Sequence, residues 1–258
     1  MLRVRVMPCL LLRRQGLVKT VRFGAAKYVG DPMNTVRIFN EKEVDELIVL
    51  DIRATPDKKE PNFELLGEMA QECFMPMAYG GGVRSVEHAK RLFGLGIEKV
   101  IINSAAWQSP ALIEQLAARF GSQAVVGAID AKRDFFGRYR PVSESARKKH
   151  PVDVATHARA LEQRGVGEIL ITSVDRDGTF QGYDVALTER VARAVRVPVV
   201  ACGGAGKLSD LGPPVHQAGA SAVAAGSLFV YQGRHRAVLV NFPTRAELEG
   251  LFPAQASR

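Results

Sequence analysis

Short apolar runs rich in valine and isoleucine recur along the chain, and stretches with apolar residues at helical spacing separate them. Such runs favour buried strands, whereas the helical spacing favours amphipathic helices. The pattern predicts eight strands, over residues 4–12, 46–51, 75–79, 99–102, 124–128, 168–173, 197–201 and 222–225. It predicts seven helices between them, over residues 32–42, 62–73, 86–95, 110–120, 153–164, 184–195 and 208–218.

Strict alternation of strand and helix predicts parallel strands, and eight of them predict a closed α/β barrel, the (β/α)8 TIM barrel. An open, doubly wound sheet is the alternative that the same alternation allows. We expect a single barrel domain over residues 1–258. Its half-barrels are expected at about residues 1–122 and 123–245, followed by a C-terminal tail over residues 246–258.

An internal repeat supports the two half-barrels. In each half, a strand that begins at a proline ends in a glycine cluster, and the next strand ends in a small, hydroxyl-bearing turn. The pairs Glu46 and Glu168, Pro76 and Pro198, and Gly81 and Gly203 are each 122 positions apart. A repeat of nearly half the chain predicts a barrel with two-fold internal symmetry.

The repeated loops predict phosphate binding. Adjacent loops lie side by side at the carboxyl ends of barrel strands, where backbone N–H groups can converge on a phosphate. A lone glycine pair also makes an ordinary turn, but two copies in register predict a ligand with a phosphate at each end. The predicted phosphate residues are Gly81, Gly82 and Ser104 in the first half, and Gly203, Gly204, Gly226 and Ser227 in the second.

Three carboxylates are candidates for chemistry, because a residue that follows a barrel strand lies at the catalytic face. Asp130 ends the fifth strand, with turn capping as its alternative role, and Asp51 follows the second strand, with loop orientation as its alternative. Asp177, next to Gly178, follows the sixth strand and shares the mouth with the second glycine loop. Lys19 lies in a long, glycine-containing segment, which predicts either a lid over an anion or a solvated loop lysine.

Charged residues begin several strands, at the opposite end of the barrel. They are Arg5, Glu46, Lys99 and Glu168. The plain interpretation is a layer of salt bridges that closes the barrel, and the alternative is a gate over a passage through it. None of the five histidines has metal-ligand spacing, so we predict no metal and no cofactor.

Composition narrows the class of protein. The net charge of +8 suits phosphorylated substrates or an acidic partner. No stretch interleaves dense basic residues with aromatic ones as single-strand binders do, so we predict no nucleic-acid partner. No apolar run approaches the roughly 18 residues of a membrane span, so we predict no membrane association. Three cysteines without metal spacing indicate a reducing cytoplasm.

Six short runs carry a resemblance to a known family: PCL at 8–10, GDP at 30–32, YGGGVRS at 79–85, AIDAK at 128–132, DRDGT at 175–179 and CGGAG at 202–206. Together they resemble the cyclase subunit of imidazole glycerol phosphate synthase, a lyase-type barrel enzyme of histidine biosynthesis. The resemblance covers residues 2 to about 231.

The resemblance implies a heterodimer in which a glutaminase subunit docks at the barrel bottom. Ammonia then passes through the barrel to a substrate that bears two phosphates. It implies that the strand-start charges Arg5, Glu46, Lys99 and Glu168 form an ammonia gate. It also implies that Lys19, Asp51, Asn103 and Thr172 line the mouth, and that Asp130 is one of two catalytic carboxylates.

The other catalytic carboxylate is missing. The family pattern continues PCL with Asp-Val, whereas this chain has Leu11 and Leu12. Leucine transfers no protons, and general acid–base groups contribute about 10²–10⁴-fold to a rate. Cys202 replaces the usual serine of the second phosphate loop, and residues 134–150 also depart from the family pattern.

Three interpretations follow from this pattern. The chain resembles most a paralogous group of the family, found in surface-polysaccharide gene sets, that supplies ammonia for acetamidino sugars. The first alternative is a histidine-pathway cyclase in which a nearby residue replaces the lost carboxylate. The second is a non-catalytic barrel that activates or scaffolds a glutaminase.

Overall fold

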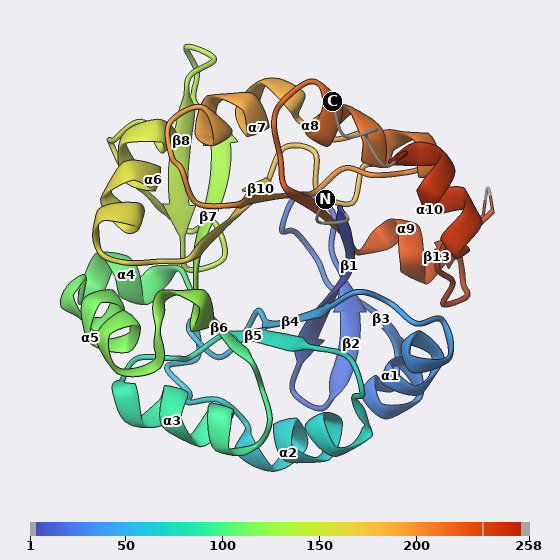
Figure 1. The fold of residues 1–258 in the computed structure, drawn as a ribbon, viewed down its shortest axis with the longest axis horizontal. Helices are drawn as coiled ribbons and strands as arrows, with labels where there is room; N and C mark the ends of the chain where they lie inside the picture. Colours follow the sequence, from blue (N-terminus) through green and yellow to red (C-terminus); the bar gives the residue numbers. More distant parts are fainter. Residues whose placement is uncertain (1–3, 234, 254–258) are drawn as a thin grey trace.

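The computed structural model describes residues 4–233 and 235–253. Eight parallel strands close into a barrel with helices around it, which confirms the predicted (β/α)8 fold (Figure 1). The strand order is β1–β4–β5–β6–β7–β10–β11–β12, and β12 pairs with β1. The barrel strands are β1 (Arg5–Arg13), β4 (Leu47–Asp51), β5 (Met77–Gly80), β6 (Lys99–Ile102), β7 (Val125–Arg133), β10 (Glu168–Ser173), β11 (Val199–Cys202) and β12 (Ala222–Ala225).

The helices between the strands lie close to the predicted ranges. They are α1 (Pro32–Glu41), α2 (Phe63–Glu72), α3 (Val86–Gly94), α5 (Ala111–Phe120), α6 (Val154–Gln163), α7 (Val185–Ala192) and α8 (Gly212–His216), the last preceded by the 3₁₀ turn η2 (Leu208–Leu211). The side chains of Asp31, Asn62, Ser85, Asp153 and Asp184 cap α1, α2, α3, α6 and α7 in that order. Each accepts a backbone N–H of the first turn, which fixes where the helix begins.

The segment after β1 is a hairpin and not the long loop that the sequence predicts. Strands β2 (Gly16–Lys19) and β3 (Lys27–Gly30) pair antiparallel with each other, and β2 also pairs antiparallel with the end of β1. Lys19 is therefore a strand residue with 6% of its surface exposed, which contradicts the solvated loop lysine.

A second extension follows β7, where residues 134–150 depart from the family pattern. Strand β8 (Tyr139–Ser143) pairs antiparallel with β7, and β9 (Lys148–Lys149) pairs with β8. Figure 1 shows β7 and β8 projecting beyond the ring of helices.

Several short elements complete the described residues. They are α4 (Ser104–Gln108), η1 (Ser122–Ala124), α9 (Ser227–Val230), β13 (Tyr231–Gln232), β14 (Ala237–Val238) and α10 (Arg245–Leu251). Helix α10 occupies much of the expected C-terminal tail, because Thr244 and Glu247 form a capping box that starts it. Residues 254–258 of that expected tail lie outside the described residues.

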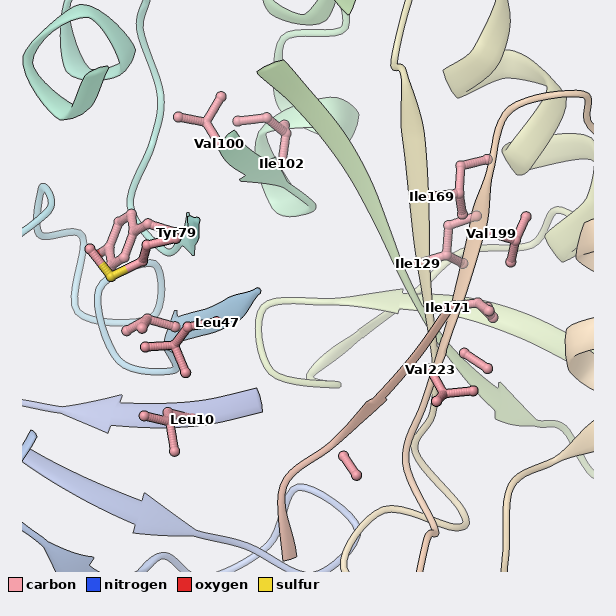
Figure 2. Close-up of a cluster of buried hydrophobic side chains, with 14 of the residues drawn as sticks. Leu10, Leu47, Tyr79, Val100, Ile102, Ile129, Ile169, Ile171, Val199 and Val223 are labelled. Atoms are coloured by element: carbon pink, nitrogen blue, oxygen red, sulfur yellow. The ribbon is translucent and has the colours of Figure 1, made fainter. Parts of the chain in front are cut away.

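Strand side chains alternate between two apolar layers. One layer packs between strands and helices and contains fully buried residues such as Leu47, Tyr79 and Ile169 (Figure 2). The other fills the inside of the barrel and includes Ala128 and Leu170. Because the middle of the barrel is apolar, its charged groups gather at the two ends.

Candidate functional site

A cavity of about 370 Å³ lies at the carboxyl ends of the barrel strands, the end that we call the mouth. Its lining contains the predicted residues Leu11, Asp51, Gly81, Gly82, Asn103, Ser104, Asp130, Thr172, Asp177 and Cys202. A second cavity of about 30 Å³ shares Leu11, Asp177 and Cys202 with the first. Its lining adds Lys19, Gly178, Gly203, Gly204, Gly226 and Ser227. The structure therefore brings the predicted mouth residues together around two adjoining cavities.

Asp130 lies near the end of β7, with its partners on the two neighbouring strands. Its carboxylate Oδ2 accepts a hydrogen bond of 2.8 Å from Asn103 Nδ2 at the end of β6. Burial, reinforced by the negative charge of Asp177, raises the pKa of Asp130 to about 7, against the opposing hydrogen bonds from Asn103 and Thr172. A carboxyl group with this pKa can both accept and donate a proton near neutral pH.

Asp177 lies after β10 and contacts the β2 hairpin. The Thr20 hydroxyl donates to Asp177 Oδ2 over 3.4 Å, and the Arg22 N–H donates to the Asp177 carbonyl over 2.9 Å. Burial raises the pKa of Asp177 to about 6, although Lys19 and Thr20 oppose the shift. The cavity thus holds a second carboxyl group that titrates close to neutral pH.

Lys19 is the buried cation of the mouth. Its Nζ donates to the Cys9 carbonyl over 2.5 Å, and burial lowers the pKa of the ammonium group. Its position between the second glycine loop and Asp177 comes from the β2 hairpin, which folds the chain back over β1.

Asp51 lines the larger cavity and also holds the turn that follows β4. Its Oδ1 accepts the backbone N–H groups of Arg53 and Ala54, over 2.8 and 3.0 Å. These bonds lower the pKa of Asp51, but burial outweighs them and the net shift is upward. The carboxylate therefore orients the turn after β4 while facing the cavity.

The glycine loops lie where side chains would collide with neighbouring backbone. Gly81 has a φ of +128°, and a Cβ there would lie 2.6 Å from the Asp51 carbonyl oxygen. Gly204 has a φ of +114°, and a Cβ there would lie 2.2 Å from the Gly182 carbonyl oxygen. Both loops therefore require glycine and present bare backbone to the cavities.

Leu11 lies at the mouth, at the position for which the sequence resemblance implies an aspartate. It lies near the end of β1, lines both cavities and packs against the apolar layer inside the barrel. Its β4 neighbour in the strand pairing is Leu50, which also lines the larger cavity. This side of the mouth is consequently apolar and offers no proton donor at position 11.

The four charged residues at the amino ends of the strands form one closed ring. Arg5 Nη1 contacts Glu46 Oε2 at 2.6 Å, and its Nη2 contacts Glu168. Lys99 Nζ contacts Glu46 Oε1 at 2.8 Å and Glu168 Oε2 at 3.1 Å. The two glutamate side chains are only 5% and 9% exposed. The predicted set is therefore brought together, and we call it the ionic ring.

Sequence reasoning missed several residues of the mouth. Thr20 lines the larger cavity, and so do Glu144, Ser145 and Arg147 in the turn between β8 and β9. The run of basic residues at 147–149 is visible in the sequence. Because it lies far from the predicted strands, the sequence does not indicate that it reaches the mouth. Trp107 stacks on His150 with a ring-centroid distance of 3.6 Å, a contact that no sequence pattern announces.

Residues 4–233 and 235–253 contain no group of three or more His, Cys, Asp and Glu that could hold a metal ion. Over the same residues, no helix is long and apolar enough to cross a membrane.

The fold and the site together define a (β/α)8-barrel protein whose polar residues gather in a cavity at the carboxyl ends of the strands, the usual location of barrel active sites. The chain belongs to the histidine biosynthesis protein family, whose model matches residues 5–236.

Individual relatives agree over nearly the full chain. The chain is 54% identical over 249 residues to "Putative imidazole glycerol phosphate synthase subunit hisF2" of Pseudomonas aeruginosa, covering 96% of this chain and 99% of the relative. It is 44% identical over 248 residues to "Putative imidazole glycerol phosphate synthase subunit hisF3" of Vibrio vulnificus, covering 96% and 95%. It is 41% identical over 231 residues to "Imidazole glycerol phosphate synthase subunit HisF" of Alkaliphilus metalliredigens, covering 90% and 92%. The resemblance recognised in the sequence is confirmed.

Proposed function

We propose that this chain is the ammonia-receiving barrel of a glutaminase-coupled synthase, and that it is a paralogue serving acetamidino-sugar formation for surface polysaccharides. The observation that carries the proposal is Leu11. It is an apolar side chain at the position where the resemblance implies a catalytic carboxylate, and the two adjoining cavities are lined by the other residues predicted for the mouth. The similarity to chains named hisF2 and hisF3 supports a paralogue of the cyclase subunit.

The ligand is a small molecule with two phosphates. The two glycine loops line adjoining cavities, and each needs glycine because neighbouring backbone lies within 3 Å of a would-be Cβ. Bare backbone N–H groups and nearby hydroxyls suit phosphate oxygens. The buried Lys19 adds positive charge on the side of the second loop.

The glutaminase docks at the end of the barrel that carries the ionic ring. The ring lies between that end and an apolar interior lined by small side chains such as Ala78, Ala128 and Ala222. An apolar interior favours uncharged ammonia over ammonium, because an unpaired charge there is poorly solvated. Phe74 precedes β5 at the same end and is 87% exposed, as suits an aromatic anchor in an interface.

Reconstitution with a glutaminase subunit of this family tests the proposal. We expect the barrel to stimulate glutamate formation saturably, at one barrel for each glutaminase. Phe74→Ser should weaken this stimulation, whereas Phe135→Ser should leave it unchanged, because Phe135 is also highly exposed, at 97%, but lies on the β7–β8 extension. A barrel that neither binds nor stimulates the glutaminase would refute the proposal.

A histidine-pathway cyclase is the second candidate, and one observation favours it. Asp130 and Asp177 line the same cavity with pKa values of about 7 and 6, so the mouth still holds two groups able to exchange protons. In that case Asp177 takes the part of the carboxylate missing at position 11. Turnover with free ammonia separates this candidate from the proposal.

A further inference from the structure

The turn between β8 and β9 is held over the first phosphate loop in a strained conformation. Glu144, Ser145 and Ala146 have φ angles of 54°, 58° and 63°. The left-handed region is unfavourable for residues other than glycine, so surrounding contacts must hold these three consecutive residues there.

Two hydrogen bonds from this turn provide part of that support. The Glu144 N–H donates to Ser104 Oγ over 3.1 Å, and Ser145 Oγ donates to the Ile52 carbonyl over 3.0 Å. The first of these bonds joins the turn to a predicted phosphate residue. The second joins it to the loop after β4.

A ring stack holds the other side of the same turn. His150 stacks on Trp107 with centroids 3.6 Å apart and planes 6° apart, and Trp107 also stacks with His157. Ser104 and Trp107 both belong to α4, so the segment is tied to this helix at residues 144 and 150. Arg147 lies between the two ties.

Arg147 is the cation that these ties bring to the first loop. It lines the larger cavity together with Gly81, Gly82 and Ser104. Among the described residues, no hydrogen bond or ion pair engages its guanidinium group. Arg84 of the first loop does not line the cavity and donates to the Lys58 carbonyl instead, whereas Lys19 lines the smaller cavity beside the second loop.

The other cations of the cavity wall are less suitable than Arg147 for binding a phosphate at the first loop. Arg53 lines the cavity but pairs with Asp57 through two guanidinium nitrogens. Arg13 ends β1, which is three strands from β6 and its Ser104 turn in the strand order. Arg147 is the unpaired cation tied to that turn.

We infer that Arg147 is the phosphate-binding cation of the first loop, an inference that rests on the proposed binding of a bis-phosphorylated ligand. Its guanidinium group donates to oxygens of the phosphate. The Ser104 hydroxyl, which already accepts the Glu144 N–H, donates its own hydrogen to the same phosphate. The strained turn thus serves to place a planar, permanently charged donor at the cavity wall.

Inorganic phosphate is the probe, with binding followed by calorimetry and by fluorescence. Trp107 is the one tryptophan of the chain and lies three residues after Ser104, so its emission reports on the first loop. We expect Arg147→Gln to weaken phosphate binding there roughly tenfold, the loss typical of one charge-assisted hydrogen bond. Arg147→Lys should recover part of the affinity, since it restores the charge without the fork of donors.

Lys149→Gln is the matched control, because it removes the same charge from an exposed residue of the adjoining strand β9 that does not line the cavity. Equal weakening by both variants would show only a general field effect and overturn the inference. Wild-type phosphate binding that Arg147→Gln leaves unchanged would also overturn it, while the proposed function stands. A wild-type protein that binds no phosphate by calorimetry would refute both.

Discussion

The two ends of the barrel carry similar charges in different arrangements. In the ionic ring, each of two cations contacts both glutamates, and the charges balance. At the mouth, Asp130 and Asp177 face one cavity, and Lys19 is the cation that favours the ionised form of Asp177. The pKa values of both aspartates are raised to near neutral pH.

The number of oppositely charged partners differs between the two ends, and this number decides whether a buried group stays charged or binds a proton near neutral pH. A buried charge that contacts two groups of opposite charge is well compensated. Removing one of those groups leaves a buried charge without compensation, which destabilises the fold. A buried carboxylate with too few partners is costly when ionised, so it binds a proton more tightly. We therefore expect the ring to stabilise the fold, and we expect the two aspartates of the mouth to exchange protons near neutral pH.

The largest expected effect comes from breaking the ring. Glu46→Gln removes a side chain charge that is only 5% exposed and leaves Arg5 and Lys99 sharing Glu168. We expect a loss of about 3–5 kcal/mol in the free energy of unfolding, measured by urea denaturation. The matched control is Glu72→Gln, which breaks the exposed pair with Arg37 and should not shift the denaturation midpoint. A ring variant as stable as this control would contradict the comparison.

A smaller effect of opposite sign is expected at the mouth. The pKa of Asp130 rises to about 7 in the folded protein, so ionising it above that pH opposes folding. Asp130→Asn should therefore stabilise the protein at pH 8, by up to about 4 kcal/mol. The gain should shrink as the pH falls and become small near pH 4, where the folded aspartate is protonated and the unfolded one is only about half ionised. Thermal unfolding at pH 8, 6 and 4 would show this, and a variant less stable at pH 8 would contradict it.

The smallest expected effect concerns the cation of the mouth. Lys19 holds down the pKa of Asp177, so Lys19→Met should raise that pKa above its value of about 6, by roughly one unit. Carbon-13 NMR titration of the Asp177 carboxyl group measures the shift. Lys132→Met, at an exposed position of β7, is the control and should leave the titration unchanged. An unshifted Asp177 in the Lys19 variant would show that the two charges do not interact.

The barrel could be predicted because its strands are buried on both faces. Strands of this kind are continuous apolar runs, and the predicted ranges 99–102, 168–173 and 222–225 coincide with β6, β10 and β12. Their carboxyl ends then locate Asp130 and Asp177 at the mouth without further information, since parallel strands of a barrel end on one face.

The two hairpin extensions escaped prediction for a physical reason. Strand β2 pairs with the end of β1 and β3 pairs with β2, and because both short strands mix polar and apolar residues, no apolar run marks them in the sequence. The burial of Lys19 depends on the pairing of β2 with β1, because its Nζ reaches the Cys9 carbonyl only across that pairing. The turn that carries Arg147 is likewise positioned by Ser104 and Trp107, which lie about 40 residues earlier in the chain.

Turnover of the family's bis-phosphorylated ribulosyl substrate with saturating free ammonia tests the central claim most directly, because it removes the partner from the question. The wild-type chain is compared with Leu11→Asp, which restores a carboxylate to the apolar side of the mouth. Our account predicts no turnover by the wild type and a gain of activity in the variant. Wild-type turnover at an ordinary enzymatic rate of about 1 s⁻¹ or more would contradict it and identify a histidine-pathway cyclase.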